Sequence, residues 1–391
     1  MRPLLLILFC LFGLTFHLTA NHQWQQIADF GNFGRHRATG MGIGNKAYCG
    51  TGHLNGTGFD TWYADWWEYD PATNAWTQKT DYPGNNGNGD QDVVSVSIGN
   101  VGYAGMGQMD GNGFYKYDPV VNLWTQVTSP PATASFNNSF PFKIGDKGYF
   151  PSIFSTAFYE YDPALDVWTQ RSNIPFSTSF GVPTFAIGDK GYIKNAANFW
   201  EYDPVTDLWT PKAPFPGTSP HRPAGIGQYN YGFFIGGFAG NPSALPWIWA
   251  PEVWRYDPLV DTWEQLEDFP GTTRRWAVAM NIGDDVYYGL GTNGTNFNDF
   301  WRFNSLASEE QIDLDSFKVY PMPASDYVNI KSANYLNYTM HLYAVDGTHV
   351  LELSTTNGAI KIQRDNLPSG SYFYKIQVDG TVIHSDKIIF R

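Results

Sequence analysis

The sequence predicts an all-β fold in which one four-stranded unit is repeated along most of the chain. The phrase Tyr-Asp-Pro, with Trp five positions after the proline, occurs five times at intervals of 41 to 54 residues. Intervals of this length are typical of repeat architectures. The 391 residues also include 40 Gly, 25 Pro and 17% aromatic side chains, a balance that favours short strands joined by tight turns.

Two turns can be assigned in each repeat. In the Asp-Pro turn, proline fixes φ and cannot continue a strand ladder. The other turn is an Ile-Gly-Asn or Ile-Gly-Asp phrase, which occurs five times and whose last two residues tolerate positive φ in a hairpin. Each repeat is therefore expected to hold four antiparallel strands, with the aromatic phrase on the third and Trp at the start of the fourth. An Asn or Asp stands three positions after each proline, as Asn74, Asn122, Asp166, Asp207 and Asp261.

The two ends of the repeat region complement each other. Trp24-Gln25-Gln26 matches the start of a fourth strand, but no earlier strands precede it. The sixth repeat runs to about Phe303 and no Trp strand follows it. We therefore expect the N-terminal segment to supply the missing strand. The predicted fold is a six-bladed β-propeller closed by an N-terminal strand, with no open edge between the first and last blades.

The phrases of residues 21–305 resemble the kelch repeat, a family that folds as a β-propeller. The third and fourth repeats depart from the paired glycines of that family, with Phe150-Pro151 and Ile193-Lys194 at the end of the second strand. The resemblance implies a propeller domain over residues 21–305. It also brings two enzymatic precedents, because some kelch-like propellers are copper oxidases of sugars and a six-bladed bacterial kind epimerises sialic acid.

Residues 1–20 predict a secretory signal peptide. They contain Arg2, an apolar run over residues 4–14 and a small residue at Ala20, which is the pattern of a charged region, a hydrophobic region and a cleavage site. The run is short for a membrane span and no later stretch is long enough for one, so we expect no transmembrane segment in the mature protein.

The C-terminal part predicts a second domain. Residues 306–316 are polar and are expected to be a linker, and residues 317–391 alternate in a way that favours a small β-sandwich. This tail resembles the C-terminal sorting domain of the type IX secretion system of Bacteroidota. The resemblance implies export across both membranes, the secretion machinery as a partner, removal of the tail, and release or cell-surface attachment. It rests on residues 319–324, 342–347 and 367–372 and on the ending Lys387-Ile388-Ile389.

Composition and motifs argue against several classes of function. The net charge is −13 and no basic run occurs, which argues against nucleic acid, because phosphate contacts need clustered Lys and Arg. After processing, Cys49 is the single thiol, and we expect it to be a small buried side chain in a strand. No nucleophile elbow, Walker loop, zinc-protease helix or paired-Cys motif occurs. We therefore predict no catalytic set, no cofactor and no metal site.

Strand order puts the two repeated turns on one face and the variable loops on the other, and variable loops on a uniform scaffold are where binding is expected. Arg37 and Arg222 both lie 11 residues before an aromatic residue of the second strand, and Arg274-Arg275-Trp276 falls at the equivalent place in the sixth repeat. Asp92, Asn138 and Gly181 occupy it in the other repeats. A basic and aromatic sector is therefore expected to face an acidic to neutral sector across the channel mouth.

The candidates for ligand binding on this face include long-loop residues as well. They are His36, Arg37, Asp60, Trp62, His221, Arg222, Trp249, Arg275 and Trp276. Arginine recognises carboxylates with two parallel hydrogen bonds, and exposed tryptophan offers a flat face to rings. The alternative is that these arginines pair with carboxylates of neighbouring blades and that the tryptophans pack the loops.

Three functions fit these observations. The favoured one is a secreted or cell-surface binding protein whose variable face binds a glycan, a peptide or a protein partner. The second is a carbohydrate-active enzyme, such as a sialic-acid epimerase at the channel mouth, for which Arg37, Arg222, His221 and Asp60 are candidates. The third is a structural surface protein without a small ligand.

Overall fold

The computed structural model describes residues 24–56, 59–218, 221–240, 246–305, 317–332, 335–345, 348–365, 367–378 and 381–391. The predicted signal peptide 1–20 and linker 306–316 lie outside these ranges. Within them, the only helix is the short 3-10 turn η1 (Gly84–Gly87), and no helix is long and apolar enough to span a membrane.

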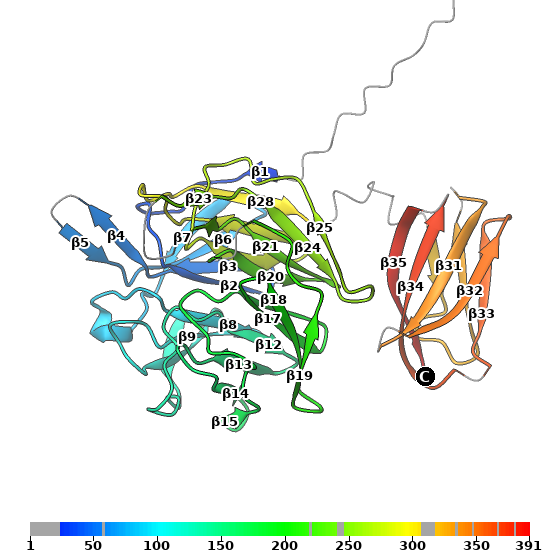
Figure 1. Cartoon of the computed structure of the whole chain (residues 1–391), viewed down its shortest axis with the longest axis horizontal. Coiled ribbons are helices and arrows are strands. Elements are labelled where there is room, and N and C mark those ends of the chain that lie inside the picture. The colour runs from blue at the N-terminus through cyan, green and yellow to red at the C-terminus, as the bar shows by residue number, and fades with distance from the viewer. Residues whose placement is uncertain are drawn as a thin grey trace, which may run out of the picture.

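The described part of residues 24–305 forms six antiparallel sheets of four strands (Figure 1). The first sheet holds β2 (Thr39–Ile43), β3 (Lys46–Gly50), β6 (Trp66–Asp70) and β7 (Ala75–Lys79). The second holds β8 (Val94–Ile98), β9 (Val101–Gly105), β10 (Phe114–Asp118) and β11 (Leu123–Gln126). The third holds β12 (Phe142–Ile144), β13 (Lys147–Pro151), β14 (Phe158–Asp162) and β15 (Val167–Arg171). The fourth sheet holds β16 (Thr184–Ile187), β17 (Lys190–Asn195), β18 (Asn198–Asp203) and β19 (Leu208–Lys212). The fifth holds β20 (Ala224–Gln228), β21 (Tyr231–Ile235), β24 (Val253–Asp257) and β25 (Thr262–Gln265). The sixth holds β26 (Val278–Ile282), β27 (Asp285–Gly289), β28 (Phe300–Asn304) and β1 (Trp24–Gln26).

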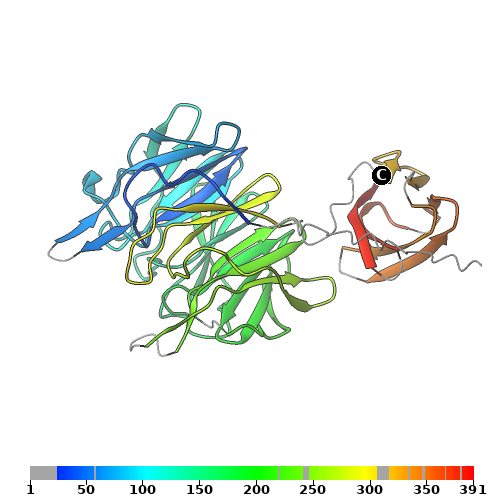
Figure 2. The ribbon, with the colours of Figure 1, turned by 90° about the horizontal axis from the view of Figure 1, so that it is seen from above.

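The sheets have a propeller-like arrangement. The first strands contact one another in the order β2, β8, β12, β16, β20 and β26, and β26 contacts β2 again. Figure 2, which views the ribbon from above, shows these sheets side by side, with the first and sixth adjacent. The long segments after β3 and β21 were expected to be loops. Each instead carries a two-stranded hairpin, β4 (His53–Gly56) with β5 (Phe59–Trp62) and β22 (Phe238–Ala239) with β23 (Ile248–Trp249).

The repeated phrase makes the same contacts in successive sheets. In the first sheet, Asn74 has φ 50°, and its Oδ1 accepts hydrogen bonds from Tyr69 Oη (2.9 Å) and from Ala28 N (2.9 Å). Trp76 Nε1 donates to Ala28 O at 3.1 Å. Residue 28 lies in the segment before this repeat, so the turn and the tryptophan together attach each sheet to the preceding chain. The five turn residues that act in this way are Asn74, Asn122, Asp166, Asp207 and Asp261.

Strand β1 completes the sixth sheet. It pairs antiparallel with β28, with Trp24 opposite Phe303. The Trp24 side chain is buried, packs edge-on against Phe269 at 5.1 Å between ring centroids, and donates from Nε1 to Glu267 O at 3.3 Å. The N-terminal segment therefore takes the place of the missing fourth strand of the last repeat.

The tail contains two sheets. One holds β29 (Phe317–Tyr320), β30 (Tyr327–Ser332) and β33 (Ala359–Gln363), and the other holds β32 (His349–Thr355), β31 (Tyr338–Ala344), β34 (Gly370–Val378) and β35 (Thr381–Phe390). Buried side chains from both sheets, among them Ile330, Met340 and Ile388, form one core. This agrees with the expected small β-sandwich.

Trp24→Ala is expected to lower the free energy of unfolding of the repeat region by about 3–5 kcal/mol, because it removes a buried indole between two sheets. Chemical denaturation followed by circular dichroism measures this loss. Trp62→Ala is the control, because Trp62 is 37% exposed on a hairpin. Equal small losses in the two variants would contradict a structural role for β1.

Candidate functional site

One backbone position recurs just before the first strand of every sheet. The residue there has a left-handed conformation in all six sheets, with φ between 53° and 69°. The six residues are Arg37, Asp92, Asn138, Gly181, Arg222 and Trp276, and we call them the mouth ring. Backbone hydrogen bonds link consecutive members, from Asp92 N to Arg37 O (3.0 Å), from Asn138 N to Asp92 O (2.9 Å) and from Gly181 N to Asn138 O (2.9 Å).

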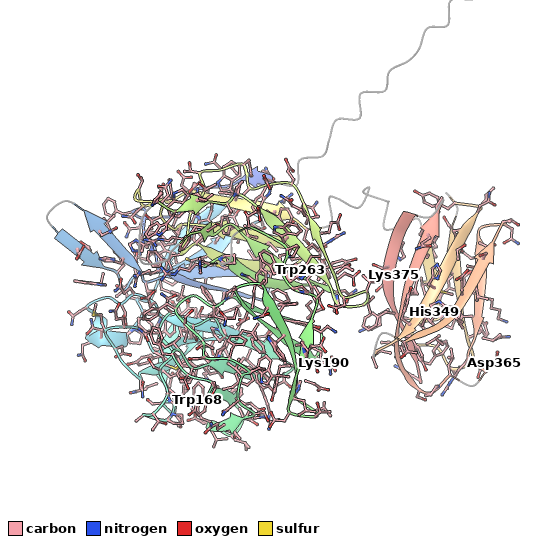
Figure 3. The ribbon with its side chains drawn as sticks, viewed as in Figure 1. Trp168, Lys190, Trp263, His349, Asp365 and Lys375 are labelled. Atoms are coloured by element: carbon pink, nitrogen blue, oxygen red, sulfur yellow. The ribbon has the colours of Figure 1, made fainter. Side chains whose placement is uncertain are left out.

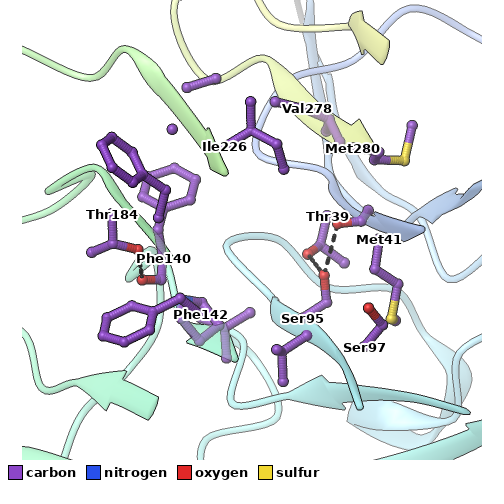
Figure 4. A pocket seen from close by; sticks show the side chains of 18 of the residues that line it. Thr39, Met41, Ser95, Ser97, Phe140, Phe142, Thr184, Ile226, Val278 and Met280 are labelled. Carbon is purple, nitrogen blue, oxygen red and sulfur yellow. Dashed lines mark hydrogen bonds between the residues drawn. The ribbon is translucent and has the colours of Figure 1, made fainter. Parts of the chain in front are cut away.

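The mouth ring lies at a central cavity of about 330 Å³. Arg37, Asp92, Asn138 and Trp276 line this cavity together with the first strands of the sheets. Figure 4 shows its wall, in which Thr39 and Ser95 are hydrogen-bonded at 2.6 Å and the side chains of Met41, Phe142 and Met280 are apolar. The cavity thus combines hydroxyl groups with aliphatic and aromatic surface.

Three arginines surround the indole of Trp276. The guanidinium carbon lies 4.2 Å from the ring centroid for Arg37, 4.5 Å for Arg222 and 3.9 Å for Arg275. Arg275 also lies 3.8 Å from the ring of Trp247, so its guanidinium sits against two indoles. Gly181 makes room for Arg222, since a Cβ at residue 181 would lie 2.9 Å from Arg222 Cγ. We call the three arginines and Trp276 the arginine cluster.

The arginine cluster carries more positive than negative charge. Within the described residues, Asp92 is its one ion-pair partner, with Oδ2 at 2.6 Å from Arg37 Nη1. Burial raises the pKa of Asp92, and the neighbouring Arg37 opposes that rise. Burial, together with repulsion from the other arginines, lowers the pKa of Arg222 and of Arg275 to about 10. Three cations and one carboxylate therefore leave an attractive potential for an anion at neutral pH.

Several donors of the cluster have no acceptor. Arg37 Nε, Arg275 Nε and Trp276 Nε1 are buried and lack a hydrogen-bond partner within the described protein. Buried polar groups are nearly always satisfied, and each exception needs a reason. Three such donors therefore belong to, or lie beside, one indole.

His36 lies beside the cluster as a neutral imidazole. Its ring stacks on Trp276 at 5.2 Å with an interplanar angle of 27°. Its Nδ1 is 2.8 Å from Asn296 Oδ1, and because the Asn296 amide nitrogen donates to Asn55, Nδ1 is the donor. Burial lowers the pKa of His36 to about 4, and Arg37, His53 and Arg275 act in the same direction.

A second cavity, of about 390 Å³, opens next to the cluster. It is bounded by His36, Arg275 and Trp276 on one side and by Trp247 and Trp249 of the β22–β23 segment on another. Asn55, Pro246, Thr292, Asn293 and Gly294 complete its wall. Three indoles and a guanidinium thus meet at this cleft.

The other predicted residues do not join the cluster. Asp60 Oδ1 lies 3.4 Å from His53 Nε2, and the ring of Trp62 stacks on His53 at 5.4 Å, so both belong to the β4–β5 hairpin. His221 pairs through its backbone with Phe238, and Trp249 packs on the same phenylalanine.

The triplet expected at the equivalent place in the sixth repeat does supply the ring residue. Trp276 occupies the ring position, and Arg275, one position earlier, forms a backbone bridge like that of His36. One expectation about the mouth needs correction. Asp92 was assigned to an opposing acidic sector, but its carboxylate pairs with Arg37 directly because the two residues are neighbours in the ring.

Two buried arginines lie next to the ring residues. Arg274 belongs to the triplet identified from the sequence, whereas Arg35 was not identified there. Arg35 and Arg274 occupy equivalent positions and pair with Asp65 and Asp299, which also accept hydrogen bonds from nearby tryptophans. Their shared spacing before Arg37 and Trp276 was the available signal. These two arginines are fully buried and each is paired with a carboxylate, so we interpret them as structural residues rather than as part of the arginine cluster.

Comparison with known proteins supports the tail and the general fold. Residues 318–391 match the family model described as the secretion system C-terminal sorting domain. This confirms the expected sorting domain and supports export, with secretion or cell-surface attachment. A solved structure titled "Structure of YjhT" is similar over 70% of this chain and 95% of its own, with a TM-score of 0.56 and 14% identity. That likeness shows the propeller-like fold. No curated protein matches the chain.

The shifted histidine predicts a pH dependence of stability. Between about pH 6.5 and pH 4 the unfolded chain binds a proton at residue 36 and the folded chain does not, so the free energy of unfolding falls as the pH falls. The loss reaches about 3 kcal/mol at most. Denaturant melts measure the free energy of unfolding of wild type and of His36→Gln across this range. The two values should converge as the pH decreases, because the glutamine of the variant does not titrate. Parallel pH profiles would contradict the buried neutral state.

Proposed function

We propose that this chain is an exported binding protein whose six sheets close as a kelch-type propeller and whose channel mouth binds a carboxylate-bearing ligand. The preferred ligand is an acidic glycan, and an acidic peptide segment has the same recognition chemistry. Closure is supported by the pairing of β1 with β28 and by the contact between β26 and β2. The matched sorting domain supplies the exported location.

The observation that carries the proposal is the arginine cluster. The guanidinium carbons of Arg37, Arg222 and Arg275 lie within 4.5 Å of the Trp276 ring centroid. Among the described residues only Arg37 has a carboxylate partner, Asp92. Holding three cations together is costly unless an anion joins them. A ligand carboxylate would supply the missing charge and accept from the unpartnered Arg37 Nε and Arg275 Nε.

The neighbouring cleft favours a ring next to that carboxylate. Trp247 and Trp249 border it, and tryptophan faces pack well against the apolar face of a sugar ring or against a peptide side chain. Asn55, Thr292 and Asn293 offer amide and hydroxyl groups for hydroxyl-bearing ligands. An acidic sugar unit fits this combination better than a simple inorganic anion, which would use the arginines alone.

A carbohydrate-active enzyme, such as an epimerase, is the second candidate, and one observation favours it. His36 is neutral at pH 7 and donates from Nδ1, which leaves Nε2 as an unprotonated base beside the cluster. Asp60, another candidate residue for such an enzyme, instead pairs with His53. Proton NMR of any sugar that binds, incubated with the protein, distinguishes turnover from simple binding.

The binding proposal is tested with matched oligosaccharides that end in glucuronate or in glucose. We expect the glucuronate form to bind and the glucose form to bind at least about tenfold more weakly, because a charged hydrogen bond contributes about 1.5–3 kcal/mol. Arg222→Ala and Arg275→Ala should each weaken glucuronate binding by at least about tenfold and leave the weak glucose binding unchanged. Isothermal titration calorimetry measures both.

Arg302→Ala is the matched control for these variants. Arg302 is on β28 and pairs with Asp285 at 3.7 Å, away from the cluster, so its loss should leave binding intact. Melting temperatures of all variants check that folding is preserved. Equal affinity for the two oligosaccharides, or undiminished binding by both cluster variants, would overturn the proposal.

A further inference from the structure

The tail carries a group of metal-binding side chains that is separate from the channel mouth. His341 lies on β31, and His349 and Glu352 lie on the paired strand β32. His341 is directly opposite Glu352 in the register, and an irregularity after Leu342 brings His349 opposite Tyr343. The three side chains therefore share one face of the sheet. Figure 3 labels His349 on this part of the tail.

The distances between these groups suit a shared ion. One ligand atom from each of the three residues lies within 4.8 Å of the others. His341 Nδ1 is 3.4 Å from Glu352 Oε2, and the two imidazole rings are 5.7 Å apart between centroids. His349 and Glu352 are exposed, so small side-chain rotations are free to bring all three atoms to metal-ligand distance.

A fourth residue orients His341 for this role. Gln377 Oε1 lies 3.1 Å from His341 Nε2 and can only accept there, so Nε2 carries the proton. Nδ1 is then the ring nitrogen left to bind a cation, and it faces Glu352. A metal-bound histidine commonly donates its other N–H to a neighbouring oxygen, which sets the tautomer and the ring orientation. A lone pair facing a carboxylate is otherwise repulsive and needs a cation or a proton between them.

We propose that His341, His349 and Glu352 bind a divalent transition metal, with Zn²⁺ as the best match, and that Gln377 is the positioning residue. Two imidazole nitrogens and one carboxylate oxygen form a donor set that zinc accepts, with water completing four-fold coordination. Ca²⁺ and Mg²⁺ prefer oxygen ligands and are excluded by the two imidazoles. The sequence alone conceals this set, because its members lie eight and three residues apart and meet only through strand pairing.

The site is tested by titrating the metal-free full chain with ZnCl₂ at pH 7.5 in a calorimeter. We expect one zinc per chain, and Glu352→Gln and His349→Ala should each weaken binding by at least about tenfold. Gln377→Leu should weaken it by about 10–100-fold, the range found for residues that orient metal ligands. Zinc should also shift the ring proton NMR signals of His341 and His349. The signals of each ring are assigned by their disappearance when that histidine is replaced.

Two controls separate this site from other zinc-binding groups. Glu264→Gln removes a carboxylate of matched 56% side-chain exposure and should leave the zinc affinity unchanged. Asp60→Asn removes the carboxylate beside His53 and should likewise have no effect. Absence of zinc binding, or binding that survives both Glu352→Gln and His349→Ala, would overturn the assignment. Circular dichroism verifies that each variant is folded.

Discussion

The fold depends on one repeated link between a sheet and the segment that precedes it. A turn Asn or Asp accepts from its own tyrosine and from a backbone N–H of the preceding segment, and a tryptophan N–H donates to a carbonyl of the same segment. In the first sheet these residues are Asn74, Tyr69 and Trp76. The link recurs in five of the six sheets, with tryptophan Nε1 to carbonyl distances of 2.9–3.2 Å, so these sheets are attached to the preceding segment in the same way. The same residues therefore pack against the preceding segment and satisfy the hydrogen bonds of its backbone.

That regularity determines where function can lie. With the turns of one face committed to structure, the segments just before the first strands bring one left-handed residue per sheet to the mouth ring at the central cavity. A small ring of this kind puts unlike side chains in contact although they are far apart in sequence. Arg37, Arg222 and Trp276 meet there, and Arg275 joins from the adjacent position. A uniform scaffold thus supports an irregular charge distribution, in which three cations have a single protein counter-ion.

Much of this architecture follows from the sequence, and the exceptions have physical causes. The role of Trp24 could be deduced from the strand that the sixth repeat lacks. The spacing of 11 residues that separates Arg37 from Tyr48 also separates Trp276 from Tyr287, so the ring position follows from the sequence. Pairing with a carboxylate of a neighbouring blade was one of the two alternatives for these arginines, and the Arg37–Asp92 pair fits it. The sequence does not show which arginine pairs, because that depends on side-chain direction across a sheet boundary. The tail cluster depends on a strand irregularity that no local pattern reveals.

In the proposed function, a ligand carboxylate completes the arginine cluster. The most direct measurement is a crystal structure of the protein with a glucuronate-terminated oligosaccharide. We expect the carboxylate within hydrogen-bonding distance of Arg222 or Arg275, with the sugar ring against Trp247 or Trp249. A ligand on the face of the Asp-Pro turns, or a well-ordered cluster with no ligand at saturating concentration, would contradict it.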